Sequence, residues 1–189
     1  MTTQPLRIVV GVDFTDTGDI ALDEAIGLAV RLEGAELHPV FVIDENARTK
    51  LSLVDDELSR AYDRLRARVL ARLEAMDAGG AHPVVFHVRL GDPAAAIHQV
   101  AVDVDADLVV VGTHGRRGLE KMLLGSVAER LVRTARLPVI VARPKQLDDL
   151  PRTPAPDEAD PERDLRAPRI MASELVQITK RPSHIAGLV

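Results

Sequence analysis

The chain has 189 residues, enough for one domain with an appendage, and 46% of them are hydrophobic, so it can form a substantial core. The absence of cysteine excludes disulfides, thiolate metal sites and a cysteine nucleophile, and the net charge of −5 argues against nucleic acid as the main partner. No apolar run is long enough to span a bilayer and no N-terminal signal is visible, so we expect a soluble, cytoplasmic protein without a membrane partner.

Short apolar runs bounded by turn residues predict five strands. They span residues 7–13, 36–43, 83–90, 107–112 and 137–142. The fourth contains an unbroken Leu-Val run, which is typical of a strand covered on both faces. The fifth has Pro138 near its start, as an edge strand permits.

Amphipathic segments predict helices between these strands. Thr15 or Asp16 can cap the first helix, whose apolar residues recur at helical spacing before Gly34 stops it. One apolar stripe among charged residues predicts a long second helix over about residues 55–76.

The last two helices have recognisable start signals. Asp92 as N-cap and Pro93 at the first helical position open the third helix. Ser126 and Glu129 match a capping box for the fourth. Strands that alternate with helices predict a doubly wound α/β fold, in which helices cover both faces of an open parallel sheet.

The composition changes beyond Pro144. Seven of the twelve prolines lie from this residue onward, mixed with acidic and basic residues, and much of the region has no apolar period. We therefore expect a domain at residues 5–144, a disordered or extended linker at 145–169, and a tail or short docking segment at 170–189.

A glycine-rich loop joins the fourth strand to the fourth helix. Its glycines are Gly112, Gly115, Gly118 and Gly125. Glycine lets the backbone approach an anion closely, and the N-terminus of a helix offers free N–H groups, so the loop predicts a phosphate cradle. Arg116, Arg117 and Lys121 either neutralise a triphosphate and its metal or are ordinary surface charges.

The spacing Gly112-x2-Gly115-x9-Gly125-Ser126 resembles the nucleotide-binding signature of the universal stress protein family, in its ATP-binding branch. Four further segments are similar to the family in the same order. They are residues 8–15, 42–44, 91–93 and 137–142. The resemblance covers about residues 5–144.

This resemblance implies a Rossmann-like sheet in the order 3-2-1-4-5, with a ligand crevice where the first and fourth strands end. It implies that Asp13 meets the adenosine end of a nucleotide and that the backbone of Val42 bonds the adenine edge. Glycines 112 and 115 would admit the ribose and phosphates, and the start of the fourth helix would bind phosphate. The expected binding residues are Val12, Asp13, Val42, Gly112, Gly115, Arg116, Gly125, Ser126 and Val127.

Two of these residues also have structural explanations. Asp13 can simply cap the helix that follows it, and Ser126 can be the N-cap of the fourth helix. A bound phosphate can occupy the same helix terminus as a capping side chain, so the two roles of Ser126 can alternate.

The resemblance leads us to expect a stress-response regulator that binds ATP with Mg²⁺ and signals by nucleotide occupancy. The sequence contains no evident general base and no Walker-type Lys-Ser pair, so we predict no catalytic residues. A weak ATPase or phosphotransferase, with His114 or Ser126 accepting phosphate, is the enzymatic alternative. A non-catalytic homodimeric scaffold, paired through the edge strand 137–142, is the third.

Overall fold

The computed structural model describes residues 5–32, 34–43, 54–78, 82–113 and 124–145. The strands are β1 (Arg7–Gly11), β2 (Glu36–Ile43), β3 (His87–Leu90), β4 (Leu108–Gly112) and β5 (Val139–Ala142). The helices are α1 (Asp16–Arg31), α2 (Val54–Ala75), α3 (Pro93–Asp103) and α4 (Ser126–Thr134). None of the helices in these ranges has a stretch long and apolar enough to cross a bilayer.

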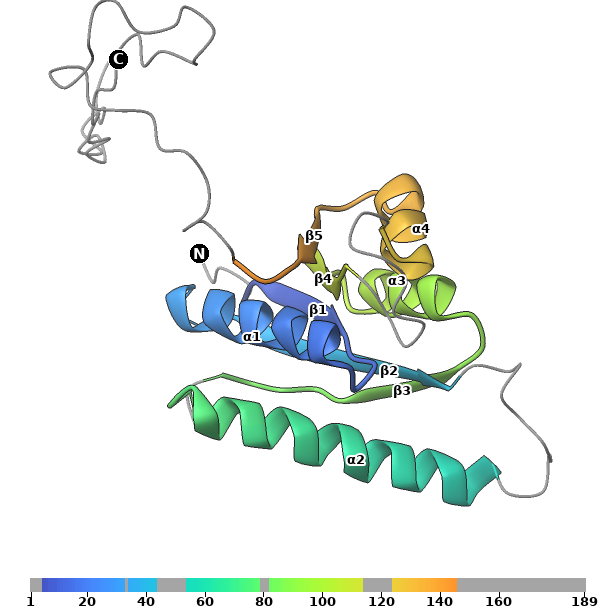
Figure 1. Cartoon of the computed structure of the whole chain (residues 1–189), viewed down its shortest axis with the longest axis horizontal. Helices are drawn as coiled ribbons and strands as arrows, with labels where there is room; N and C mark the ends of the chain where they lie inside the picture. Colours follow the sequence, from blue (N-terminus) through green and yellow to red (C-terminus); the bar gives the residue numbers. More distant parts are fainter. Residues whose placement is uncertain (1–4, 33, 44–53, 79–81, 114–123, 146–189) are drawn as a thin grey trace, which may run out of the picture. The chain divides into compact units, whose positions relative to one another are not determined.

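The strands form one parallel sheet in the order β3-β2-β1-β4-β5, which confirms the expected fold class. In the middle of the sheet, Val9 pairs with His38 on one side and with Val109 on the other. Helices α1 and α2 cover one face, and α3 and α4 cover the other (Figure 1). We call the edge where the parallel strands end the carboxyl edge; β1 and β4 meet there at the switch point of the sheet.

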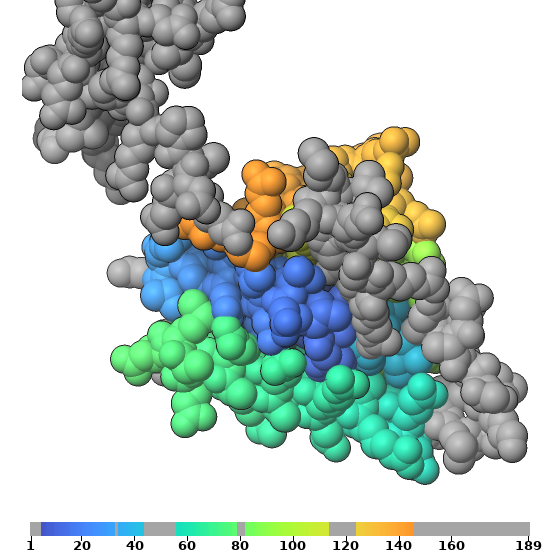
Figure 2. Space-filling view, in the orientation of Figure 1, coloured from blue at the N-terminus to red at the C-terminus, as the bar shows by residue number. Residues whose placement is uncertain are grey.

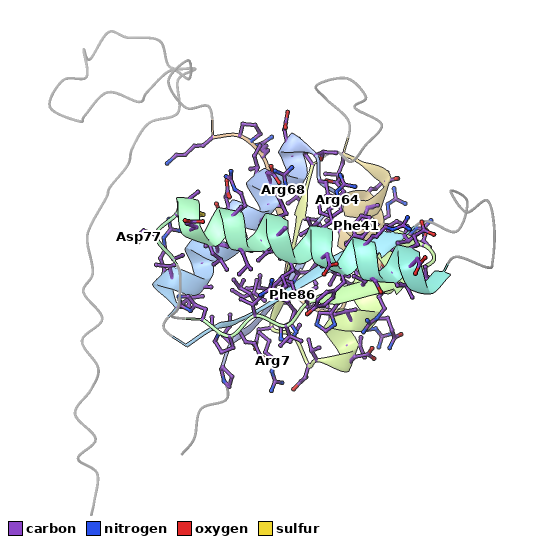
Figure 3. The ribbon with its side chains drawn as sticks, turned by 90° about the horizontal axis from the view of Figure 1, so that it is seen from below. Arg7, Phe41, Arg64, Arg68, Asp77 and Phe86 are labelled. Atoms are coloured by element: carbon purple, nitrogen blue, oxygen red, sulfur yellow. The ribbon has the colours of Figure 1, made fainter. Side chains whose placement is uncertain are left out.

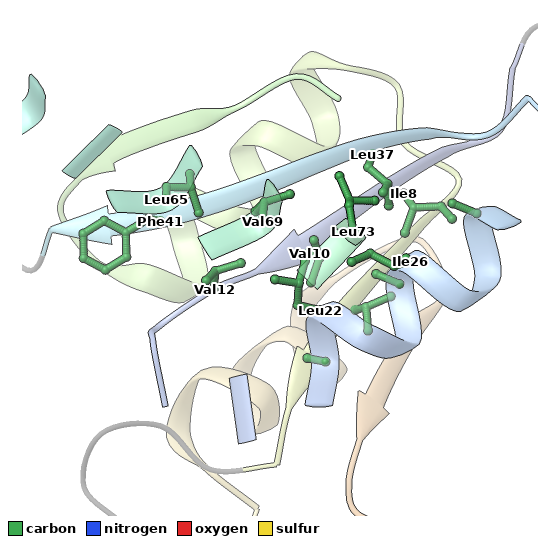
Figure 4. Packing of buried hydrophobic residues seen from close by; sticks show 14 of the residues in the cluster. Ile8, Val10, Val12, Leu22, Ile26, Leu37, Phe41, Leu65, Val69 and Leu73 are labelled. Atoms are coloured by element: carbon green, nitrogen blue, oxygen red, sulfur yellow. The ribbon is translucent and has the colours of Figure 1, made fainter. Parts of the chain in front are cut away.

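The core has one layer on each face of the sheet, because successive side chains of a strand point to opposite faces. The layer under α1 and α2 includes Ile8, Val10, Leu22, Ile26, Leu37, Leu65 and Val69 (Figure 4). The layer under α3 and α4 includes Val9, Val40, Ile97, Val100, Val109 and Leu131. The small valines of β4 reach both layers, as the sequence predicted for a strand covered on both faces.

Two ion pairs at helical spacing join α2 to α1. Arg68 Nε lies 3.3 Å from Asp19 Oδ1. Arg72 Nε donates to Asp23 Oδ1 at 2.7 Å, and the Nη2 atom of the same guanidinium donates to the other carboxylate oxygen. Each partner lies four residues from its neighbour on the same helix, so the pairs join successive turns of the two helices. Figures 2 and 3 show α2 lying beside α1.

Four strands are shorter than the sequence predicted. The strand expected at residues 7–13 ends at Gly11. The strands expected at 83–90, 107–112 and 137–142 begin later than predicted, at His87, Leu108 and Val139. Pro83 and Pro138 have no N–H to donate to a ladder, although the carbonyl of each still accepts a backbone hydrogen bond at 2.9 Å from the neighbouring strand.

Two helix starts are confirmed and one is corrected. The side chain of Thr15 accepts a hydrogen bond from Gly18 N at 3.1 Å, and that of Asp92 accepts from Ala95 N at 2.9 Å. The predicted capping box of α4 is wrong, because Gly125 is the N-cap and Ser126 is the first helical residue. The start of α4 therefore has no side-chain cap.

Candidate functional site

The expected residues of β1 and β2 lie at the carboxyl edge. The N–H of Val12 donates to Val40 O at 2.9 Å, so pairing with β2 continues past the end of β1. Backbone groups alternate in direction along a parallel strand. The carbonyl of Val40 is directed toward β1, and that of Ile43 toward β3, where it accepts a hydrogen bond from Gly91 N. By alternation, the N–H and carbonyl of Val42 are directed toward β1.

Asp13 is turned toward the start of α1. Its Oδ1 accepts hydrogen bonds from the N–H of Thr15 at 3.0 Å and from the Thr15 hydroxyl at 2.6 Å. A Cβ at Gly18 would collide with that oxygen, so the first turn of α1 closes on the carboxylate only because residue 18 is glycine. Asp13 thus supports the N-cap Thr15 and is not itself the cap.

Gly112 ends β4 against the start of α1. A Cβ at this position would lie 2.6 Å from the carbonyl oxygen of Thr17 and 2.9 Å from its carbonyl carbon. The close approach that requires glycine here is therefore to the backbone of α1. In the sequence, Gly112 could admit a nucleotide or simply serve a tight loop, and neither interpretation revealed this contact with α1.

The start of α4 is anchored at the same edge. Gly125 N donates to Thr113 O at 2.6 Å, which places the helix N-terminus directly after β4. Ser126 is exposed, and Val127 is half-buried against the core layer under α3 and α4. Because no side chain caps α4, its first N–H groups have no capping acceptor from residue 125.

These contacts bring seven of the nine expected residues to one edge of the sheet. They are Val12, Asp13, Val42, Gly112, Gly125, Ser126 and Val127. Gly115 and Arg116 lie outside the described residues, as do Gly118, His114, Arg117 and Lys121.

An ion pair at the start of α3 borders this group. Arg130 Nη1 of α4 lies 2.6 Å from Asp92 Oδ1. The N–H of Ala95 lowers the pKa of the Asp92 carboxyl, and the Arg130 guanidinium lowers it further, so the pair stays charged. It holds the N-terminal half of α4 against the start of α3.

Two buried histidines meet on the α3 face of the sheet. His38 and His87 are 4% and 9% exposed, and Nδ1 of His38 lies 3.0 Å from Nε2 of His87. Burial lowers the pKa of both rings; for His87, the neighbouring His38 and Arg89 also contribute and the pKa falls to about 4. The sequence did not reveal this pair, because it depends on the register that sets Val40 opposite His87.

Metal ligands do not cluster in the part of the chain that the structure describes: no three His, Asp or Glu residues there are arranged to hold an ion. The two histidines share a hydrogen bond, and the carboxylate beside them, Glu36 Oε2, lies 3.6 Å from the other nitrogen of His38. One hydrogen bond therefore joins the two rings, and the Glu36 carboxylate lies near His38 at ion-pair distance.

Comparison with known proteins identifies the family of this chain. The universal stress protein family model matches residues 6–143. The universal stress protein MJ0531 of Methanocaldococcus jannaschii is 32% identical over 145 residues, which cover 72% of this chain and 81% of that protein.

Solved structures agree with this match. The hypothetical protein MJ0577 superposes with a TM-score of 0.62 at 26% identity, covering 76% of this chain and 99% of that one. A universal stress protein in complex with cAMP has the same fold, with a TM-score of 0.53 at 24% identity over 74% of this chain and 98% of that one. The chain belongs to the universal stress protein family.

Proposed function

We propose that residues 5–144 form an adenine-nucleotide-binding regulatory domain, which takes ATP with Mg²⁺ and signals by occupancy. One observation carries the proposal: the uncapped N-terminus of α4 is anchored at Thr113, next to the switch point where Asp13 follows β1. A helix start without a side-chain cap offers N–H groups to an anion, and the switch point of an open parallel sheet is the usual ligand crevice.

The residues at the carboxyl edge fit the parts of such a ligand. Asp13 and the backbone of Val42 would bind the adenosine end, while the N–H groups of Ser126 and Val127 and the exposed hydroxyl of Ser126 would bind phosphate. Gly115 and Arg116 would complete the phosphate site. Mg²⁺ is usually held largely by the phosphates of a bound nucleotide, and it would neutralise their charge.

A shift in stability tests this proposal directly. Adding ATP and Mg²⁺ at a hundredfold excess over the dissociation constant is expected to raise the free energy of unfolding by about 2.7 kcal/mol, because only the folded chain binds. Thermal unfolding with ATP, ADP, AMP and GTP, each with and without Mg²⁺, measures the shift. Equal shifts with GTP would refute adenine selectivity, and no shift with any nucleotide would refute the proposal.

The same samples distinguish binding from turnover. Incubation with labelled ATP, followed by assay of released phosphate and of label retained on the protein, is expected to show neither. Steady phosphate release would support the ATPase alternative, and label lost in Ser126→Ala would support phosphotransfer to that hydroxyl.

We also propose that the domain pairs with a second copy through β5, which among the described strands is paired with β4 alone. Val109 N donates to Pro138 O and Thr113 N to Ala142 O, so by alternation the N–H groups of Val139 and Val141 point away from β4. Groups directed outward from an edge strand can form the hydrogen bonds of an intermolecular sheet.

Proline at an outward position is expected to remove the dimer and keep the fold. Val141→Pro deletes an outward donor without deleting a bond to β4, whereas Ile140→Pro deletes an inward one and should destabilise the monomer. Sedimentation equilibrium and urea unfolding measure the two effects. A dimer that survives Val141→Pro would rule out pairing through this edge.

A further inference from the structure

The residue after Asp13 has an unusual backbone. Phe14 has a φ of 63°, the left-handed region that bulky side chains rarely adopt. Such a conformation costs free energy and persists only where surrounding contacts hold it. Its position, between the end of β1 and the N-cap of α1, places it beside a residue of the proposed nucleotide site.

Two contacts hold the ring of Phe14. Its centroid lies 4.7 Å from that of Phe41, which precedes Val42 on β2. The guanidinium carbon of Arg64 lies 3.9 Å from the Phe14 centroid, within cation–π distance. Arg64 and Phe41 are labelled in Figure 3. Residues from β2 and α2 therefore support the turn that joins β1 to α1.

The position of Arg64 follows from the way α2 joins α1. Arg64, Arg68 and Arg72 recur every four residues, and the latter two bind Asp19 and Asp23. The position four residues before Asp19, which would continue this series, is the neutral N-cap Thr15. Within the described ranges Arg64 forms no ion pair, and its guanidinium lies over the Phe14 ring.

The turn that these contacts hold determines where the Asp13 carboxylate points. Thr15 donates two hydrogen bonds to Asp13 Oδ1, and Phe14 is the residue that joins Asp13 to Thr15. We propose that Arg64 and Phe14 are positioning residues of the nucleotide site, which keep the β1–α1 turn in the conformation that presents Asp13 to an adenine nucleotide. The ligand in this inference rests on the proposed function; neither residue needs to touch it.

Nucleotide affinity tests the inference in the full-length chain. Arg64→Gln is expected to weaken binding of ATP with Mg²⁺ about two- to fivefold in titration calorimetry, the loss that a single cation–π contact implies. Arg64→Lys should recover part of this loss, because an ammonium keeps the attraction to the ring. The matched control is Arg60→Gln, one turn earlier on α2, where the side chain is 81% exposed and pairs with Asp56.

The outcome is decisive in either direction. Equal weakening in Arg60→Gln would show a general effect of helix charge and would overturn the inference. Unchanged affinity in Arg64→Gln, or an Arg64→Lys variant no better than Arg64→Gln, would do the same. A loss of affinity confined to Arg64→Gln and partly recovered in Arg64→Lys would support it, since a merely structural role would not follow the charge of the side chain.

A measurement without nucleotide separates this inference from the proposed function. In ¹H–¹⁵N spectra, Arg64→Gln should shift the amide resonances of Thr15 and Gly18, which donate to Asp13 and to Thr15, while Arg60→Gln should leave them unchanged. If the wild-type chain binds no adenine nucleotide, the proposed function fails. The Thr15 resonance still shows whether Arg64 holds the turn. If this resonance does not shift in Arg64→Gln, the positioning role of Arg64 is overturned.

Discussion

Gly112→Val is expected to lower the free energy of unfolding by about 3 kcal/mol, at the upper end of what overpacking costs. The added Cβ would lie 2.6 Å from the carbonyl oxygen of Thr17 and 2.9 Å from its carbonyl carbon, and these are backbone atoms that cannot rotate away. Relief requires α1 to move off β4, which opens the core around Leu22 and Ala25. Urea unfolding of the nucleotide-free protein measures the loss.

Gly27→Ala is the matched control for this substitution. Gly27 lies inside α1, and a Cβ there has no atom within 4 Å. Alanine at an open helical position should raise stability by up to about 1 kcal/mol, because glycine disfavours a helix interior. Two glycine substitutions that involve the same helix should therefore change stability in opposite directions. A Gly112→Val variant as stable as wild type would show that α1 does not lie against β4 as described.

The contact between Gly112 and α1 complicates the interpretation of mutations at this glycine. Loss of nucleotide binding in a Gly112 variant would follow from displaced α1, since the Asp13–Thr15 turn begins that helix. It would not demonstrate that the nucleotide approaches the backbone at Gly112. Variants of Ser126, which is exposed and uncapped, separate binding from stability more cleanly.

The sequence predicted the architecture because local patterns decide it. The unbroken valines of β4 and the helix starts at Thr15 and Asp92 each depend on a few neighbouring residues. Alternation of strands and helices then leaves few topologies to consider. The strand order itself came from the family resemblance, and the structure confirms it.

Features that depend on packing between distant segments could not be predicted in this way. The collision that requires glycine at 112 involves a helix that starts 96 residues earlier in the chain. The capping box at Ser126 has the right residue types, but the helix begins one residue earlier in register, with Gly125 as its cap. The arginine over Phe14 and the histidine pair each join residues 49 or 50 positions apart.

The buried histidine pair makes stability depend on pH. A consistent set of protons exists when both rings are neutral: His87 Nε2–H donates to His38 Nδ1, and His38 Nε2–H points toward Glu36 Oε2 at 3.6 Å. Protonating His87 places a charge in the core beside His38 and Arg89, which both disfavour it, whereas Asp103 favours it. Burial is the largest influence on His38 and lowers its pKa; Arg7 acts in the same direction, and the two outweigh Glu36, which raises it.

The direction of the pH effect follows from these shifts. The pKa of His87 is about 4 in the folded chain against 6.5 for the ordinary group, so between these values the unfolded chain binds more protons. The contribution of His87 to the free energy of unfolding is therefore fully present above pH 6.5 and is lost as the pH falls toward 4. Below about pH 4, His87 is protonated in both the folded and the unfolded chain and lowers the free energy of unfolding no further.

Between pH 7.5 and pH 5, His87 alone is expected to reduce the free energy of unfolding by about 2 kcal/mol, as the linkage between the two pKa values requires. Urea unfolding across this range measures the loss, and carboxylates contribute little to it above pH 5. The double variant His38→Leu/His87→Leu removes both partners, leaves no buried nitrogen unpaired, and should flatten the curve. An equally steep slope in the double variant would place the pH sensitivity elsewhere in the chain.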